Sequence, residues 1–217
     1  MGIRKKTIGA VLTGDIVNST KLLPTQEERL IKKLKDVLDK FLGRHLHKFY
    51  RGDSFQVYMD KPEDALLMAL KCRTLAIEIA GKEEAGVVSD IRISIGIGEV
   101  NLPIRDLGIA KGEAFLLSGR RFDVLQEAEQ RLAIVSGEPL ADIGFQVMAD
   151  YLDSIYSKMT GKQAEVIIEL LSNTTQQQLA ETLKKSKSTI SQLANAGRWP
   201  EIERLLKQYE LLINQIL

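Results

Sequence analysis

The chain has 217 residues, of which 44% are apolar and 27% charged, and its formal net charge is +1. These values are typical of a globular protein, and they exclude a chain that binds polyanions through its overall charge. One cysteine excludes an intramolecular disulfide, and no apolar run has the length of a membrane span. We therefore expect a cytoplasmic protein without a membrane partner, in which any nucleic-acid site is a local patch.

The first part of the chain alternates between strand and helix patterns. Residues 7–17 are apolar and partly β-branched and run up to Asp15, which favours a buried strand over a signal peptide. Apolar residues at helical spacing then predict a helix over 24–42. Two extended arms predict a hairpin over 46–59, and a second helix is expected over 62–80.

The next segments complete an α+β domain. Residues 90–100 alternate, with an isoleucine at every second position, and predict a half-buried strand. A loop at 101–110, a helix at 111–128 and a short strand at 131–136 follow. The order strand, helix, hairpin, helix, strand, helix, strand predicts a sheet with one helical face, related to the ferredoxin-like arrangement.

The remaining residues have helical patterns. Residues 140–158 form one long amphipathic helix, and 161–217 are helical with breaks at Asn173, at 184–186 and at 197–200. A shift in composition near residues 137–160 marks the expected boundary. The predicted units are an α+β domain at 1–137, a connector helix at 138–158 and an all-α domain at 159–217.

Residues 175–196, TQQQLAETLKKSKSTISQLANA, carry the most specific pattern in the chain. Ser186 stands where the second of two short helices needs an N-cap. Apolar positions recur on one side of each helix, at Leu179, Ala180 and Leu183 and then at Ile190 and Leu193. The segment resembles the helix-turn-helix modules of bacterial transcription regulators.

The resemblance implies that the second helix enters the major groove of double-stranded DNA. Its outward polar side chains would meet the bases, and they are Lys187, Ser188, Thr189, Ser191, Gln192 and Asn195. Gln176, Gln177, Lys184, Lys185 and Arg198 would contact phosphates.

Two features qualify this interpretation. Lys184 stands in the turn where such modules usually have glycine. Residues 158–217 hold eight Lys and Arg against six Asp and Glu, so non-specific affinity should be low and the DNA-binding unit a homodimer. The apolar excess of the last helix, 201–217, also favours dimerisation. The alternative is a helical tail that serves dimerisation or protein docking only.

A second group of polar residues lies in the N-terminal part. Asp15 ends the first strand and Asp53 lies at the hairpin tip, so the two carboxylates converge if the hairpin pairs beside that strand. Such a pair suits Mg²⁺ held with triphosphate oxygens, with Ser19 and Thr20 as hydroxyl donors. Taken singly, each aspartate is also a common turn former.

Four segments carry a resemblance to known families: LTGDIVNST (12–20), FYRGDSFQVYM (49–59), IRISIGIGEV (91–100) and GEAFLLSGR (112–120). They resemble the palm-type catalytic domain of class III nucleotide cyclases and, over almost the whole N-terminal part, the SatD family. The resemblance implies Asp15, Ile16 and Asp53 as metal contacts and Arg120 as a phosphate ligand. The implied cofactor is Mg²⁺ or Mn²⁺ with a nucleoside triphosphate.

Three positions depart from the cyclase pattern. The asparagine that orients the ribose falls on Leu116, the base-reading lysine on Phe49 and its polar partner on Ile109. Because catalysis needs groups that act on the transition state, we expect a non-catalytic palm domain that binds a nucleotide and controls the helix-turn-helix. One alternative is a cyclase-like lyase or other phosphoryl-transfer enzyme that uses Asp15 and Asp53. Another is an interaction module with neither activity.

Overall fold

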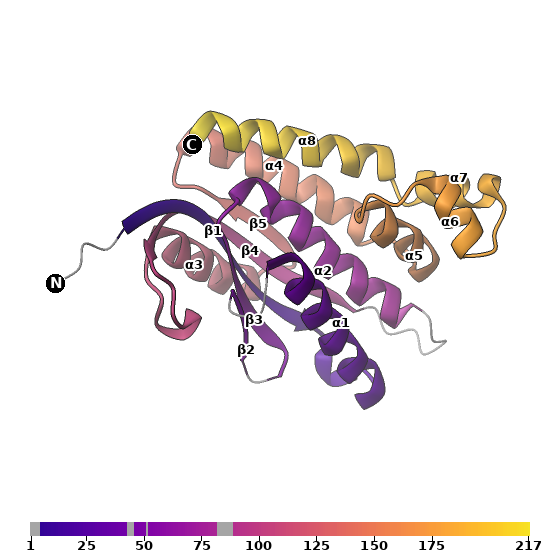
Figure 1. Cartoon of the computed structure of the whole chain (residues 1–217), viewed down its shortest axis with the longest axis horizontal. Helices are drawn as coiled ribbons and strands as arrows, with labels where there is room; N and C mark the ends of the chain where they lie inside the picture. Colours follow the sequence, from indigo (N-terminus) through magenta and orange to yellow (C-terminus); the bar gives the residue numbers. More distant parts are fainter. Residues whose placement is uncertain (1–4, 43–45, 51, 82–88) are drawn as a thin grey trace.

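A five-stranded sheet forms the centre of the N-terminal part (Figure 1). The computed structural model describes residues 5–42, 46–50, 52–81 and 89–217. The strands follow each other across the sheet in the order β2-β3-β1-β4-β5. All neighbours are antiparallel except β4 and β5, which are parallel. The strands are β1 (Lys5–Val17), β2 (His47–Tyr50), β3 (Ser54–Met59), β4 (Asp90–Leu102) and β5 (Leu132–Val135).

Helices α1 (Pro24–Leu42) and α2 (Ala65–Ala80) cover one face of the sheet (Figure 1). The order β1-α1-β2-β3-α2-β4 with β1 between β3 and β4 is the predicted ferredoxin-like arrangement. Short 3-10 turns precede each helix, at Ser19–Lys21 (η1) and Pro62–Asp64 (η2). Helix α2 is apolar almost all round, and accordingly it is buried on nearly every side.

The expectation of one helical face is wrong, because α3 (Glu113–Glu127) packs on the other face. Strand β4 is therefore buried on both sides instead of half-buried. Small residues allow this contact: a Cβ on Gly96 would lie 2.4 Å from the carbonyl oxygen of Ala114. The expected loop at 101–110 holds the end of β4 and a 3-10 turn, Leu107–Ile109 (η3).

The C-terminal part is helical, as predicted, and shares one core with the sheet domain. Positive φ angles at Asn173, Lys184 and Arg198 fall on the three predicted breaks. Within the described ranges, no helix has both the length and the apolar character needed to cross a bilayer. The helices are α4 (Pro139–Tyr156), α5 (Gly161–Leu170), α6 (Gln176–Thr182), α7 (Lys187–Ala196) and α8 (Trp199–Ile216).

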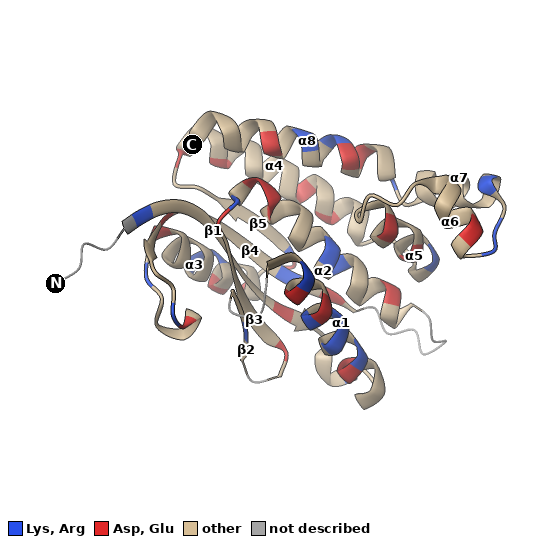
Figure 2. Cartoon of the chain, in the orientation of Figure 1, with Lys and Arg blue, Asp and Glu red and all other residues tan. Residues whose placement is uncertain are grey.

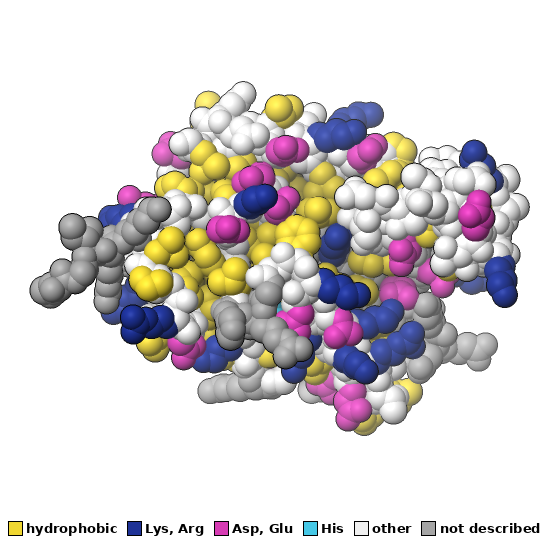
Figure 3. All heavy atoms as spheres, viewed as in Figure 1, with side chains coloured by type: hydrophobic (Ala, Val, Ile, Leu, Met, Phe, Trp, Pro, Cys, Tyr) yellow, Lys and Arg dark blue, Asp and Glu magenta, His cyan; other side chains and the backbone are white. Residues whose placement is uncertain are grey.

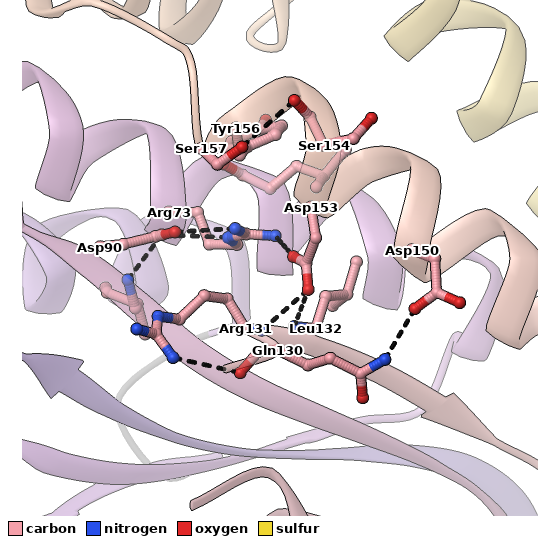
Figure 4. A network of polar contacts seen from close by, with 12 residues as sticks. Arg73, Asp90, Gln130, Arg131, Leu132, Asp150, Asp153, Ser154, Tyr156 and Ser157 are labelled. Atoms are coloured by element: carbon pink, nitrogen blue, oxygen red, sulfur yellow. Dashed lines mark hydrogen bonds and ion pairs between the residues drawn. The ribbon is translucent and has the colours of Figure 1, made fainter. Parts of the chain in front are cut away.

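Two contacts fix the helical part against the sheet domain. Helices α2 and α5 meet backbone to backbone, since a Cβ on Gly81 would lie 2.6 Å from the Cα of Gly161. A polar network joins α2 to α4 around the buried side chain of Arg73 (Figure 4). Arg73 donates to both carboxylate oxygens of Asp90, at 3.0 and 2.7 Å, and to Asp153 at 2.6 Å. The predicted connector helix is thus an integral part of the fold.

Candidate nucleic-acid interface and metal site

Helices α6 and α7 form the two-helix unit that the sequence predicted. The side chain of Thr175 caps α6 in a capping box with Gln178, and that of Ser186 caps α7 by accepting the Thr189 N–H at 3.0 Å. Apolar residues hold the pair together: Leu179 and Ile190 are buried. The caps and the apolar positions of the unit are thus local in the chain, while Leu179 and Ile190 pack in the core that the helices share with the sheet domain.

The turn between α6 and α7 has the geometry of a Schellman motif. Lys184 is in the left-handed region with φ 51°. The N–H of Lys185 donates to the carbonyl of Ala180 at 3.0 Å, and the N–H of Lys184 donates to that of Glu181 at 3.3 Å. The lysine thus occupies the position that usually favours glycine, as its place in the sequence suggested.

Most of the predicted base-reading residues lie on the outer side of α7. Lys187, Ser188, Gln192 and Asn195 are exposed, and Thr189 and Ser191 are partly so. The hydroxyl of Thr189 shares a 2.8 Å hydrogen bond with that of Ser186, so it serves the cap. A helix that presents amide and hydroxyl tips on one face can pair with base edges in a groove.

The residues predicted to contact phosphates differ in their surroundings. Gln177 is exposed and donates to Glu181 at 3.0 Å, while Gln176 is half-buried at the start of α6. Arg198 is tied to α4 and α8, because it donates to the Tyr151 hydroxyl at 2.9 Å and pairs with Glu201 at 2.7 Å. The Arg198 side chain therefore links α4 to α8 within the protein.

The surface over α6 and α7 is mostly uncharged. Figure 3 shows white, uncharged polar surface at this end of the molecule, with a few Lys and Arg side chains at its margins. Figure 2 places basic residues at the turn and the start of α7, and acidic ones on α5 and α6. Lys185 pairs with Glu165 at 3.2 Å. Non-specific attraction to phosphates is accordingly weak, and contact with bases has to contribute more of any affinity.

The sheet domain brings Asp15 and Asp53 to one end of β1. In the β1–β3 register Asp15 lies opposite Ser54, and Ser54 directly follows Asp53 in the chain. The N–H of Ile16 donates to the Asp53 carbonyl at 3.1 Å, which ties the strand end to the hairpin tip. Burial raises the pKa of Asp15, the nearby Arg92 lowers it, and the negative charge of Asp53 raises it again. The structure thus brings Asp15 and Asp53 together at one end of β1, as the sequence suggested.

Arg92 is the residue of this site that the sequence analysis missed. It lies opposite Asp15 on β4 and donates from Nη1 to both carboxylate oxygens, at 3.2 and 3.0 Å. The signal was present, because the alternation of β4 places Arg92 on the face opposite the isoleucines. Its Nε is buried and has no hydrogen-bond partner among the described residues.

The donor chemistry at this edge fits a hard divalent cation, since two carboxylates and backbone carbonyls are the ligands that Mg²⁺ prefers. Two observations weigh against a ready-made metal site. Arg92 already neutralises Asp15, and no group of three or more His, Cys, Asp or Glu suited to a metal exists in the described ranges. A cation would have to displace the guanidinium.

The predicted phosphate ligands do not all lie at the Asp15–Asp53 site. The hydroxyl of Ser19 donates to Asp53 at 3.0 Å. Thr20 follows Ser19 in η1 and is exposed to solvent. Arg120 is on α3 and exposed to solvent, and no contact of its side chain with either carboxylate is found in the described part of the chain. The structure brings Ser19 to the site and leaves Arg120 outside it.

A cavity of about 340 Å³ opens between the hairpin, η3 and α3. Its lining includes Gly14 and Ser54, the chain neighbours of Asp15 and Asp53, but neither aspartate itself. The side chains around it are mixed polar and aromatic, and include those of Thr13, Tyr50, Phe115 and Phe122. Of the three departures from the cyclase pattern, Leu116 and Ile109 are exposed, and Phe49 stacks on Phe55 at 5.5 Å. None of the three lines this cavity.

A comparison with protein families finds a match in the C-terminal part of the chain. A helix-turn-helix family model matches residues 168–212, which include α6, α7 and most of α8. No curated protein matches the chain. Residues 168–212 therefore form a helix-turn-helix segment.

Solved cyclase structures are similar to about three fifths of the chain. A bacterial light-regulated adenylyl cyclase has a TM-score of 0.40 at 12% identity, over 62% of this chain and 43% of that one. The active GGEEF domain of a diguanylate cyclase from Vibrio cholerae has a TM-score of 0.42 at 11% identity, over 60% and 83%. A guanylyl cyclase has a TM-score of 0.37 at 19% identity, over 57% and 73%. The chain thus spans less than half the length of the light-regulated enzyme.

Proposed function

We propose that the chain is a DNA-binding transcription regulator in which α7 reads the major groove of double-stranded DNA. The observation that carries this proposal is the exposed polar face of a capped second helix inside the segment that matches the helix-turn-helix family. Gln192 and Asn195 lie one turn apart on that face. Amide side chains can pair with adenine through two hydrogen bonds, which makes them the main candidates for sequence recognition.

The test uses DNA selected from a random duplex library by the full chain. Gln192→Ala and Asn195→Ala are expected to weaken binding to the selected site by about 1–3 kcal/mol each and to blur the base preference at one position. Asn214→Ala is a matched control, because it removes an exposed amide from α8. Selection that enriches no sequence, or binding that both α7 variants leave unchanged, would contradict the proposal.

In this proposal the sheet domain is a palm-type domain of the SatD kind that binds a metal-nucleotide and controls DNA binding. Support comes from the convergence of Asp15 and Asp53 at one end of β1 and from the nearby cavity, which their chain neighbours Gly14 and Ser54 line. When bound, the cation would supply positive charge to triphosphate oxygens, and Asp15, Asp53 and the Ile16 carbonyl would hold it. Ser19 and Thr20 would donate to the phosphates, and Arg120 would have to turn inward.

The second candidate function is a metal-dependent cyclase-like or other phosphoryl-transfer enzyme at the same site. The meeting of Asp15 and Asp53 at one end of β1 favours it, and the apolar residues at the three departing positions count against it. Calorimetry of each nucleoside triphosphate with Mg²⁺ or Mn²⁺ separates the candidates. Binding without turnover supports control, whereas turnover that Asp53→Asn abolishes supports the enzyme. No binding of any triphosphate contradicts both.

A further inference from the structure

An exposed apolar face lies on α4 and α8, and the proposed DNA recognition does not use it. The two helices pack side by side and run in opposite directions (Figure 1). Near the end of α4, the Tyr151 hydroxyl accepts a hydrogen bond from Arg198, which precedes α8. Earlier in α4, a Cβ on Gly144 would lie 3.8 Å from the side chain of Leu212, late in α8. Between them lies a groove of about 420 Å³ with a largely apolar lining.

The apolar side chains on this face are strongly exposed. Leu140 is 84% exposed, Ile143 65% and Val147 66% on α4, and Leu211 is 63% exposed on α8. Leu140, Ile143, Val147 and Tyr151 follow each other at spacings of three, four and four, which is the seam of a helix that packs on another helix. No charged residue stands within that seam. Burial of such side chains is favourable, so the face is built to be covered.

The size of the face agrees with a second copy of the chain as its occupant. Helices of eighteen residues are about 27 Å long and pack about 8–10 Å apart, so two of them present on the order of 500 Å² in projection. Two such faces together bury on the order of 1,000 Å², the lower bound of a specific protein interface. A two-fold contact makes the same face serve both partners.

The shape of the face points the same way. Two antiparallel helices placed against a symmetric copy form a four-helix bundle, in which apolar seams of this kind become the core. The groove between α4 and α8 offers a hole, and the exposed Ile143, which does not line the groove, offers a knob that a symmetric copy could insert there. We propose that the α4–α8 face is the interface of a homodimer that closes as a four-helix bundle.

The proposal goes beyond DNA recognition and is tested without DNA. Light scattering after size exclusion, on the full chain over a wide range of concentrations, is expected to show a dimer. Val147→Glu and Leu211→Glu each place two charges in the symmetric interface, and each is expected to raise the dimer dissociation constant by about a hundredfold or more. Val124→Glu is the control, because Val124 is a half-exposed apolar residue on α3.

The outcomes are distinct. Circular dichroism melts show whether a variant still folds, and Val147→Glu and Leu211→Glu are expected to melt as cooperatively as Val124→Glu. A wild-type chain that stays monomeric at the highest concentration overturns the proposal, as do folded α4 and α8 variants that remain dimeric. Either result leaves DNA recognition by α7 to its own experiment, so the two proposals fail separately.

Discussion

Arg73 on α2 donates a 2.6 Å hydrogen bond to Asp153 on α4, and the contact joins the sheet domain to the helix that leads into the helix-turn-helix (Figure 4). Asp153 also accepts from the N–H groups of Arg131 and Leu132, at 2.8 and 3.2 Å. One carboxylate therefore holds the start of β5, the middle of α2 and the end of α4 together.

We predict that Arg73→Met destabilises the chain by about 3–5 kcal/mol, because it leaves Asp90 and Asp153 without their buried counter-ion. Urea denaturation of the full chain measures the loss. The double variant Arg73→Met with Asp153→Asn should recover part of it, since one of the two unpaired charges is then absent. A loss below about 1 kcal/mol for the single variant would show that water reaches the network and solvates both carboxylates.

The close contact of Gly81 with Gly161 predicts that the stability of the chain is sensitive to an added side chain at this point. A Cβ on Gly161 would lie 2.7 Å from the Cα of Gly81, and the obstacle is backbone, which cannot turn away. We expect Gly161→Ala to force α5 away from α2 and to cost about 1–3 kcal/mol of stability.

Gly119→Ala on α3 is the matched control for this change. A Cβ there meets nothing within 4 Å, and alanine favours a helix over glycine by about 1 kcal/mol, so the control should gain stability. Thermal melts of both variants give the comparison. Equal melting temperatures for Gly161→Ala and the wild type would show that α2 and α5 separate without cost.

The pattern of the chain predicted the elements and the helix-turn-helix well, because caps and apolar spacing are local. Ser186, Leu179 and Ile190 act within about a dozen residues of each other, so their roles are visible in the sequence. The packing of α3 was predicted wrongly. Ser94 and Gly96 alternate with the isoleucines of β4, which suggests a face exposed to solvent, but α3 packs on this face. Small residues on a strand suit either solvent or a close helix, and the pattern alone does not distinguish the two.

The candidate metal site shows the same limit. Asp15 and Asp53 were recognised from their places at a strand end and a turn. The partner of Asp15, however, is Arg92 on β4, 77 residues away in the chain. Pairing between strands decides which side chains meet, and the register of β1 against β4 becomes known only with the structure.

Lys184 gives a prediction that depends on backbone geometry alone. Its φ of 51° costs a residue with a Cβ about 1–2 kcal/mol, and glycine avoids that strain at a smaller cost in unfolded-state entropy. We expect Lys184→Gly to stabilise the chain by about 0.5–1 kcal/mol in thermal melts. Lys185→Gly is the control, because it removes the ion pair with Glu165 and relieves no positive φ. A destabilised Lys184→Gly variant would mean that the lysine side chain contributes more than the strain.

The coupling between Asp15 and Asp53 predicts a change in titration. Burial raises the pKa of Asp15, Arg92 opposes this, and Asp53 adds to the rise. Asp53→Asn removes the repulsion and leaves the other influences on Asp15 in place, so the Asp15 carboxyl should titrate at lower pH. Carboxyl carbon NMR of the full chain measures this directly. Asp123→Asn, at an exposed position on α3 that does not act on Asp15, should leave the titration unchanged.

The same coupling fixes the sign of a stability effect. A carboxyl whose pKa is raised in the folded state favours folding at acid pH, and that contribution is lost as the pH rises through the folded-state pKa. The loss is smaller in Asp53→Asn, because its Asp15 pKa is closer to the ordinary value. The stability of Asp53→Asn relative to the wild type should therefore increase from acid to neutral pH. Parallel stability curves for the two proteins, together with an unmoved Asp15 titration, would mean that the carboxylates do not interact and that this edge of the sheet is not poised for a cation.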